Sequence, residues 1–492
     1  MNRDDLERRI GARSFARLLG DWRPPEGRGL ADALADRIRL LVLDGRLPLQ
    51  TRVPAERELA AALLVSRTTV AGAYDALRVA GVLRSRRGSG SWTQLPEHRG
   101  GGHLGPFAPL GDTSLFDLAH AALPAPSEQL RSSAAAALHD FDAHLGGHGY
   151  DLAGLPVLRA AIADRYTARG LPTGPDQVLV TAGAMNAITI ALTALTGPGD
   201  RVLVEHPTYP NALQAIATRG ARAVPVPMAP QVDGASAWDL ELLTAAVRDA
   251  APRLTYLIPD FQNPTGALLD AAGRERLVDL ARRTGTPLVV DETLAELALD
   301  TSPVRPVAAH GAADSPLVLT VGSASKIFWG GLRVGWIRTS APMVRRLAAA
   351  RAPLDLGGPT LEHLVVARLL PEVEAVAATR RAELTAARDD LLTRLAAAFP
   401  GWRPARPCGG LSLWIDLDEP VSSRLTVAAR RHDVLLAAGP RFGLDGAFER
   451  HLRLPYTLRP DRMAAALDRL ARAWQDLDRA APTTDVEPVA VA

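Results

Sequence analysis

The chain of 492 residues is poor in lysine, in cysteine and in long apolar runs. Its single cysteine, Cys408, excludes an intrachain disulfide framework and a cysteine-rich metal site, and it fits a reducing, cytoplasmic environment. No apolar run approaches ~18 residues, and the N-terminus lacks the apolar segment of a signal peptide. We therefore expect a cytoplasmic protein with no membrane span and no metal site.

Lys326 is the only lysine, although lysine and arginine together number 56. Arginine keeps its charge and cannot act as an amine nucleophile, whereas lysine can. A lysine aldimine is the usual covalent link between a protein and pyridoxal phosphate (PLP). The amine in the segment 323–326 therefore suggests chemistry, although a composition biased toward arginine would also leave a single lysine.

The positive charge is concentrated in the N-terminal part of the chain. Residues 1–92 hold 17 arginines and 11 acidic residues, a net charge of +6, and the other 400 residues have a net charge of −4. A basic module joined to a mildly acidic body predicts a polyanionic partner for the N-terminal part alone. Charge by itself fits an ordinary solvated basic surface equally well.

Residues 30–93 have the pattern of a winged helix. Apolar residues at helical spacing run from Leu34 to Val42, Pro54 opens a short helix, and Ser66 is a candidate N-cap for a helix over 67–77. Residues 82–93 predict a two-stranded wing with an Arg-Gly-Ser-Gly tip. We assign residues 1–93 to this module and 94–114 to a linker rich in glycine and proline.

Residues 115–480 have the alternating pattern of an α/β domain, followed by a loose tail at 481–492. Buried strands separated by helical segments predict a mostly parallel sheet. The strands are expected at 177–180, 201–204, 254–258, 288–290 and 317–321. A long helical stretch from 341 to 397 leads to a smaller α+β subdomain, with strands at 411–417 and 452–454.

Residues suited to a flat phosphorylated ring follow these strands. Tyr209 offers an aromatic face for stacking, Asn263 offers an amide donor to a phenolate oxygen, and Asp291 can pair with a protonated pyridine nitrogen. Groups suited to a phosphate occur at a helix start, at Gly183, Ala184 and Met185, and again at Arg333, seven residues after the lysine.

On these motifs, residues 115–478 resemble the fold-type I PLP enzymes of the class I aminotransferase family. The resemblance implies that Lys326 binds the cofactor aldehyde and that Ser323, Ser325 and Arg333 hold the phosphate. It implies further that Arg453, in Leu-Arg-Leu-Pro-Tyr, binds the carboxylate of an amino acid. It also implies a homodimer in which Tyr150 reaches the phosphate of the neighbouring subunit. Thr293 and Leu294 stand where many relatives have a tyrosine that bonds the phenolate oxygen.

Residues 30–93 closely resemble the GntR-type winged helix, which implies double-stranded DNA as the partner. Tyr74 and Leu77 are expected in the core of this module. The residues expected to contact bases or phosphates lie on the two central helices and on the wing: Arg57, Ser66, Arg67, Thr68, Thr69, Arg86, Arg87, Gly88 and Ser89.

Together the two parts resemble the MocR-type transcriptional regulators, in which the large domain senses PLP and an amino-acid or amine effector. Two alternatives remain open at this point. In the first, the chain is a working aminotransferase with an appended DNA module. In the second, it is a DNA-binding protein whose large domain serves only to dimerise. Sustained transamination would favour the first alternative, and absence of bound PLP the second.

Overall fold

The structure is a computed structural model that describes residues 9–23, 29–43, 46–86, 90–94, 115–229 and 237–477. The predicted linker from residue 95 onward, the tail at 481–492 and the wing-tip residues 87–89 lie outside the described residues. The chain divides into two compact units. Unit 1 comprises Met1–His120, Thr393–Pro404 and Ile415–Ala492, and unit 2 comprises Ala121–Leu392 and Ala405–Trp414.

The N-terminal part of unit 1 is a winged helix, as predicted. Its elements are α1 (Ala12–Leu19), α2 (Leu30–Leu43), β1 (Arg52–Val53), α3 (Glu56–Leu63), α4 (Arg67–Val79), β2 (Leu83–Arg86) and β3 (Gly90–Thr93). The strands form an antiparallel sheet in the order β1-β3-β2. Helix α1 was not predicted, yet Phe15 and Leu19 on it belong to the same core as Tyr74 and Leu77.

The rest of unit 1 is a small α+β subdomain. Its sheet has the order β12-β13-β15-β14-β4. The strands are β4 (Phe116–Leu118), β12 (Arg403–Pro404), β13 (Ser412–Asp416), β14 (Val434–Ala438) and β15 (His451–Pro455), with helices α14 (Ser422–Arg430) and α15 (Pro460–Asp476). Only the last two residues of β13 belong to unit 1 itself. The two predicted strands correspond to β13 and β15. Strand β4, far away in sequence, joins parallel to β14.

A buried ion pair joins the winged helix to this subdomain within unit 1. Arg37 of α2 pairs with Glu449 and also donates from Nη1 to Ser423 Oγ at 3.2 Å. The side chains of Arg37 and Glu449 are only 5% and 9% exposed. Glu449 in turn accepts hydrogen bonds from the backbone and hydroxyl of Ser423, so the pair is fixed on both sides.

Unit 2 is built on a seven-stranded sheet with the order β5-β11-β10-β9-β8-β6-β7. Only β11 runs antiparallel to its neighbours, so the expected, mostly parallel sheet is confirmed. The strands are β5 (Val178–Thr181), β6 (Arg201–His206), β7 (Arg222–Pro227), β8 (Leu254–Leu257), β9 (Leu288–Asp291), β10 (Val318–Ser323) and β11 (Gly335–Arg338).

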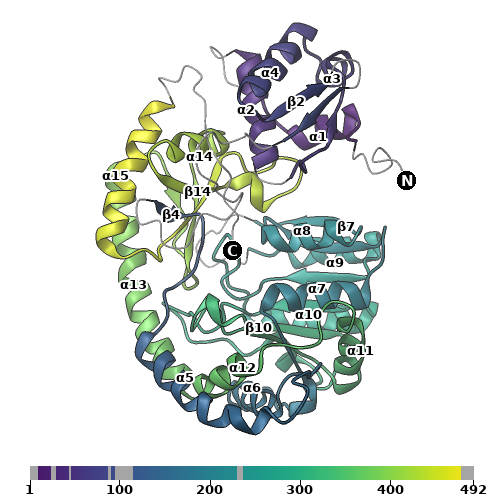
Figure 1. Cartoon of the computed structure of the whole chain (residues 1–492), viewed down its shortest axis with the longest axis vertical. Helices are drawn as coiled ribbons and strands as arrows, with labels where there is room; N and C mark the ends of the chain where they lie inside the picture. Colours follow the sequence, from purple (N-terminus) through teal and green to yellow (C-terminus); the bar gives the residue numbers. More distant parts are fainter. Residues whose placement is uncertain are drawn as a thin grey trace. The chain divides into compact units, whose positions relative to one another are not determined.

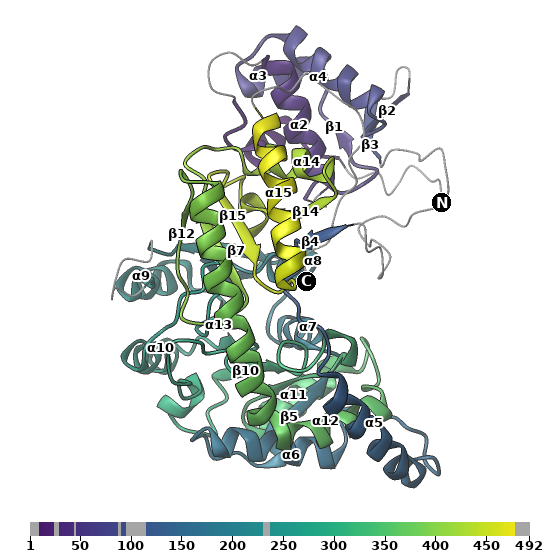
Figure 2. The same ribbon diagram turned by 90° about the vertical axis from the view of Figure 1, so that its left-hand side faces the viewer.

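Helices cover both faces of this sheet (Figures 1 and 2). Helices α7, α8 and α11 pack over one face, where their apolar residues share a core with the strands, and α9 and α10 lie on the other face. The helices of unit 2 are α5 (Ser127–Phe141), α6 (Pro156–Ala168), α7 (Ala184–Leu195), α8 (Pro210–Thr218), α9 (Leu240–Ala250), α10 (Ala271–Thr284), α11 (Ala341–Arg351), α12 (Thr360–Leu369) and the first part of α13 (Val373–Ala398).

The long helical stretch predicted from 341 to 397 is wrong in its continuity. It is three helices, α11, α12 and α13, and the first break falls at Gly357, Gly358 and Pro359. Gly357 has φ +138°, which side-chain-bearing residues rarely adopt, and proline cannot continue a helix from the preceding turn. No helix in the described ranges is long and apolar enough to cross a membrane.

A fully buried ion pair supports the loop after β8, which carries part of the candidate site. Arg274 Nη2 of α10 lies 2.7 Å from Asp260 Oδ1, with side chains 0% and 2% exposed. Arg274 Nε also donates to the carbonyl oxygen of Leu269 at 3.0 Å. The guanidinium therefore anchors α10 to the loop that leads to Asn263.

Replacing Arg274 with methionine should destabilise the protein strongly. The change leaves the buried carboxylate of Asp260 without its cation, which costs about 3–5 kcal/mol. Urea unfolding followed by circular dichroism measures the loss. The control is Arg276→Ala on the same helix, because Arg276 is half exposed and its pair with Glu241 contributes no more than ~1 kcal/mol. Equal losses in the two variants would contradict the assignment.

Candidate functional site

Asp291 ends β9 and is held by hydrogen bonds to both of its oxygens. The hydroxyl of Tyr256 donates to Oδ2 at 2.9 Å, and the backbone N–H of Thr293 donates to Oδ1 at 3.0 Å. Burial raises the pKa of Asp291, while the bonds from Thr293 and Tyr256 and the charge of Lys326 oppose that shift. The carboxylate is thus fixed in orientation and desolvated, as an acceptor for a buried ring N–H must be.

Lys326 follows β10, the strand that pairs in parallel with β9. Their register places Val321 beside Asp291, so the residues that follow both strands emerge at the same edge of the sheet. The Lys326 Nζ atom donates to the carbonyl oxygen of Ala121 at 2.8 Å. Its positive charge acts to lower the pKa of Asp291. The amine and the carboxylate therefore follow neighbouring strands at one edge of the sheet, and their predicted roles toward a cofactor stay predictions.

A phosphate-sized cradle forms where β5 turns into α7. Gly183 is the N-cap of α7 and has φ +87°, and the backbone N–H groups of Ala184 and Met185 open the helix. Arg333 reaches over this turn and donates to the carbonyl oxygen of Ala182 at 3.1 Å. A Cβ atom on Gly183 would lie 2.5 Å from Arg333 Nη2, and the positive φ itself disfavours any residue other than glycine here.

Ser323 and Ser325 complete this edge of the site. The hydroxyl of Ser323 donates to the carbonyl oxygen of Val334 at 3.3 Å and accepts the backbone N–H of Ser325 at 3.1 Å. These bonds hold the segment before Lys326 in a tight turn against β11. A helix N-terminus, an arginine and two serines together match the chemistry of a phosphate dianion.

The two residues predicted to contact the ring lie on loops that are tied to each other. Tyr209 caps α8, and its hydroxyl accepts a hydrogen bond from Asn211 at 2.9 Å. Asn263 follows Gln262, whose side chain donates to the carbonyl oxygen of Pro207 at 2.8 Å. Gln262 thus connects the loop of Asn263 with the loop of Tyr209.

The residues present fit a pyridoxal phosphate. When bound, this cofactor supplies an electron sink at a cationic pyridine ring. Asp291 would hold the ring nitrogen, Lys326 would bind the aldehyde carbon, and the cradle around Gly183 with Arg333 would take the phosphate. The predicted role of each residue stays a prediction, but one edge of one sheet positions them all.

Two predicted residues are not among those that follow the strands of the large sheet. Tyr150 is 64% exposed, which suits a residue that acts outside its own site. Arg453 lies on β15 of unit 1 and is fully buried, where it donates to the carbonyl oxygen of Ala119 and lies 5.0 Å from the ring centre of Phe442.

Sequence reasoning missed Tyr256 and Glu205. Tyr256 lies on the strand predicted at 254–258, and Glu205 directly follows the strand predicted at 201–204. Tyr256 donates a hydrogen bond to Asp291, and Glu205 accepts one from Gln262. A tyrosine or glutamate within a run of apolar strand residues is the signal that would have found them, because a buried polar group needs a partner.

The candidate DNA-contacting surface lies at the start of α4. The Oγ atom of Ser66 accepts the backbone N–H of Thr69 at 3.0 Å, which confirms Ser66 as the N-cap. Arg67 is 60% exposed, and its Nε donates to Glu56 at 3.2 Å. Arg57 and Thr68 are also exposed. Tyr74 and Leu77 are buried, as expected, and the Tyr74 hydroxyl donates to the carbonyl oxygen of Pro54.

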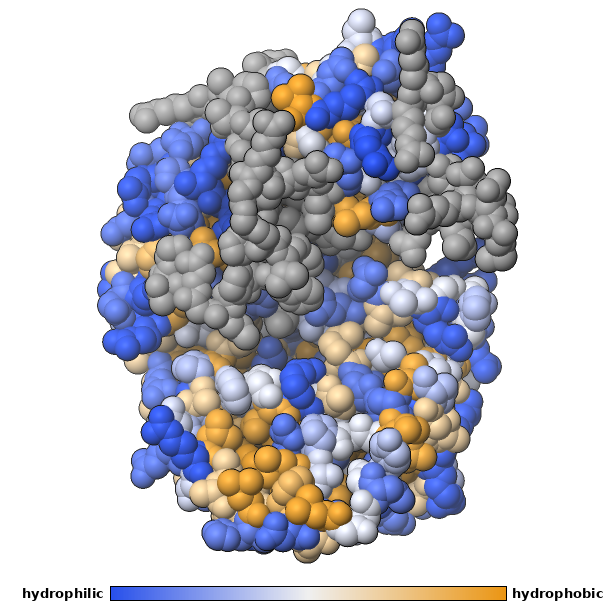
Figure 3. Space-filling view, viewed as in Figure 1, coloured by the Kyte–Doolittle hydropathy of each residue, from blue (hydrophilic) through white to orange (hydrophobic). Residues whose placement is uncertain are grey.

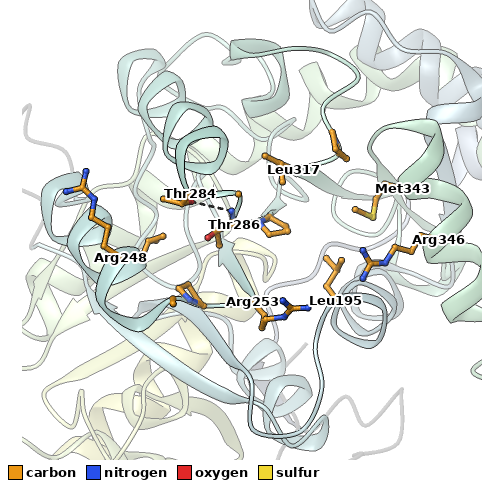
Figure 4. Close-up of a pocket in the computed structure, with 14 residues that line it drawn as sticks. Leu195, Arg248, Arg253, Thr284, Thr286, Leu317, Met343 and Arg346 are labelled. Atoms are coloured by element: carbon orange, nitrogen blue, oxygen red, sulfur yellow. Dashed lines mark hydrogen bonds between the residues drawn. The ribbon is translucent and has the colours of Figure 1, made fainter.

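A pocket of about 700 Å³ opens at the opposite edge of the large sheet, at the amino ends of the parallel strands (Figure 4). Arg248, Arg253 and Arg346 line it. Arg248 lies in the last turn of α9, Arg346 donates to the carbonyl oxygen of Ala194 in α7, and Arg253 lies 3.7 Å from Asp200. Because cations near helix C-termini compensate the helix dipole, we assign these arginines a structural role.

Comparison with known families supports this division. Residues 115–470 match the family described as aminotransferase class I and II, and residues 30–92 match the bacterial regulatory proteins of the gntR family. The chain belongs to the class I and II aminotransferase family. With its GntR-type winged helix, it is a transcription regulator with an aminotransferase-like PLP domain, as the MocR-type resemblance predicts.

Relatives and solved structures agree with this assignment. The uncharacterized HTH-type transcriptional regulator YisV of Bacillus subtilis is 26% identical over 480 residues, covering 89% of this chain and 95% of that protein. The probable rhizopine catabolism regulatory protein MocR of Rhizobium meliloti is 32% identical over 326 residues, covering 62% of this chain and 64% of that protein. The crystal structure of LysN, the α-aminoadipate aminotransferase of Thermus thermophilus complexed with N-(5′-phosphopyridoxyl)-L-leucine, has a TM-score of 0.68 at 28% identity, covering 75% of this chain and 94% of that chain.

Replacing Arg333 with alanine should weaken PLP binding. One charge-assisted hydrogen bond to a phosphate is worth ~1.5–3 kcal/mol, which corresponds to about a ten- to hundredfold lower affinity. Titration of the cofactor-free protein with PLP, followed by visible absorbance, measures this. Arg345→Ala, an exposed arginine on α11, is the control. Unchanged affinity in Arg333→Ala would remove this residue from the phosphate site.

Replacing Arg67 with alanine should weaken DNA binding by ~1–3 kcal/mol if its guanidinium reads a base. Conversely, Glu56→Gln should strengthen binding, because Arg67 no longer has to leave a carboxylate to reach the DNA. Both are measured by fluorescence anisotropy on a fragment selected by the wild-type protein from a random library. Arg13→Ala, exposed on α1, controls for the loss of one positive charge; equal effects at positions 13 and 67 would refute a specific contact.

Proposed function

We propose that the chain regulates transcription by sensing PLP and an amino-acid or amine effector, and that ligand binding changes its affinity for operator DNA. The observation that carries this proposal is the presence in one chain of a GntR-type winged helix and a PLP-shaped site with a single lysine. We place this activity in the cytoplasm, where DNA, PLP and amino acids occur together.

The effector is expected to carry a carboxylate. Arg453 is the residue that the family resemblance assigns to this group, and its guanidinium can hold two carboxylate oxygens at once. A carboxylate at this position would replace the carbonyl oxygen of Ala119 as the partner of Arg453. Because β4 begins the segment that contains Ala119, such an exchange would act on the small subdomain itself.

The contacts within unit 1 support a route from effector to DNA. Arg453 lies on β15, which starts two residues after Glu449. Glu449 holds Arg37 of α2, the helix that packs against the DNA-reading α4. A shift of β15 would therefore reach the winged helix through a buried ion pair, and two alternative positions of such a packed element can differ in DNA affinity.

An exposed apolar surface on unit 2 supports the homodimer. Tyr150, Leu152, Leu354 and Leu356 are between 37% and 64% exposed. A Cβ atom on Gly357 would lie 2.6 Å from the carbonyl oxygen of Asp151, so these two segments lie side by side. Figure 3 shows apolar residues gathered over the region of α5, α6 and α12. A surface of this kind usually marks an interface, and a second copy would bring its Tyr150 toward this site.

A working aminotransferase is the second candidate, because Lys326, Asp291 and Arg453 are all retained and the solved relative LysN is an aminotransferase. The two functions differ in what happens after an amino acid binds. A regulator needs the bound state to persist, whereas an enzyme must release product and return to its starting form.

Two measurements on the PLP-loaded chain should separate these functions. If it is a regulator, an amino compound changes the affinity for the selected DNA fragment by about 5–150-fold, the usual range of coupling between two sites. In Arg453→Met, which keeps the volume, carboxylate-bearing compounds should lose this effect. Sustained transamination at ~10 s⁻¹ with unchanged DNA affinity would contradict the proposal.

A further inference from the structure

Glu205 is a buried carboxylate behind the candidate site, and its partners are neutral. It is the fifth residue of β6, and its side chain is 1% exposed. Trp238 Nε1 donates to it at 2.7 Å, the backbone N–H of Ile258 at 3.1 Å and Gln262 Nε2 at 3.1 Å.

These bonds join the two loops that carry the ring-contacting residues. Through Gln262, the carboxylate is linked to the carbonyl oxygen of Pro207, two residues before Tyr209. The other end of the same amide accepts the backbone N–H and the hydroxyl of Thr265, which fixes the turn around Asn263. Glu205 is thus the point where both loops are anchored to the sheet.

A carboxylate at this buried position carries a desolvation penalty that a neutral acceptor would not. Burying a charge without a cation is unfavourable, and a neutral acceptor would satisfy the same donors at lower cost. The two carboxylate oxygens accept from Trp238, Ile258 and Gln262, and a hydrogen bond to a charged acceptor is stronger than one to a neutral acceptor.

We propose that Glu205 is a positioning residue for the cofactor: through its hydrogen bond to Gln262 it holds the loops of Tyr209 and Asn263 in register. This inference rests on the proposed PLP site at Lys326. Glu205 itself touches neither the ring nor the reacting atoms.

The arrangement also makes cofactor binding dependent on pH near neutrality. Burial, and to a smaller extent the charge of Asp291, raises the pKa of Glu205 to about 7. Tyr256 on β8 is a neutral phenol in the same interior, because burial raises its pKa. The positive charge of Lys326 acts to lower the pKa of Asp291, against the effect of burial. A protonated Glu205 loses its charge and one acceptor position, so PLP affinity should fall as the pH drops through 7.

Protein stability should respond to the same proton in the opposite direction. Because the folded-state pKa lies above the ordinary value of 4.5, the folded state binds this proton more tightly than the unfolded state. The stabilisation from protonated Glu205 is complete below pH 4.5 and is lost as the pH rises through 7. Wild type minus Glu205→Gln isolates this contribution from other groups.

The test is PLP affinity of the full chain between pH 6 and 8 in wild type and Glu205→Gln. We expect about tenfold weaker binding in the variant at pH 8 and a flatter pH profile, because glutamine cannot gain or lose the proton. Glu241→Gln, the same change at a carboxylate on α9 that is 83% exposed, is the matched control and should bind PLP as wild type does. Wild-type affinity with a wild-type pH profile in Glu205→Gln would overturn the proposal.

A second variant keeps the test decisive if Glu205→Gln folds poorly. Gln262→Met cuts the link to the loops but leaves the carboxylate, so affinity should fall while the pH dependence is retained. Wild-type affinity in Gln262→Met would likewise overturn the proposed positioning role. If instead wild type itself binds no PLP, the proposed function fails. That result differs from PLP affinity that is unchanged by the substitution of Glu205.

Discussion

The parallel pairing of β9 with β10 is the interaction on which the candidate site depends. It places Asp291 and the segment of Lys326 at the same edge of the sheet, with Val321 in register beside Asp291. The buried carboxylate and the amine thereby follow neighbouring strands, and the N-terminus of α7 and Arg333 are the groups that would hold a phosphate. This geometry suits a flat ring held at both ends, because the carboxyl ends of parallel strands gather at one edge.

Arginine takes the structural roles that lysine shares in other proteins, which leaves the one amine for chemistry. Arg351 donates to the carbonyl oxygen of Leu152, Arg388 pairs with Asp300 and also donates to Pro407, and Arg274 pairs with Asp260. These arginine side chains are fully buried. A planar guanidinium with five donors can satisfy several carbonyl and carboxylate oxygens at once, whereas an ammonium group acts as a point charge. The scarcity of lysine is therefore compatible with a well-anchored interior.

Much of the fold and the site was predictable from local pattern. The five strands predicted in unit 2 and the helix-turn-helix are present because apolar runs and capping residues such as Ser66 act locally. Strand β11 escaped prediction because it has only four residues and both ends, Gly335 and Arg338, fall outside an apolar run. Strand β7 escaped because it contains two prolines, which an edge strand tolerates. The long helix was wrong because glycine and proline outweighed helical spacing. Tyr256 and Glu205 were missed because their partners lie more than 30 residues away in sequence.

The central claim is that Lys326 binds PLP in a chain that also reads DNA. The most direct measurement is reduction of the PLP-loaded protein with borohydride, followed by digestion and mass spectrometry. The account predicts one pyridoxyl-labelled peptide, which contains Lys326, and none in Lys326→Ala. A protein that yields no labelled peptide at this position, or that carries the label equally in the variant, would contradict it.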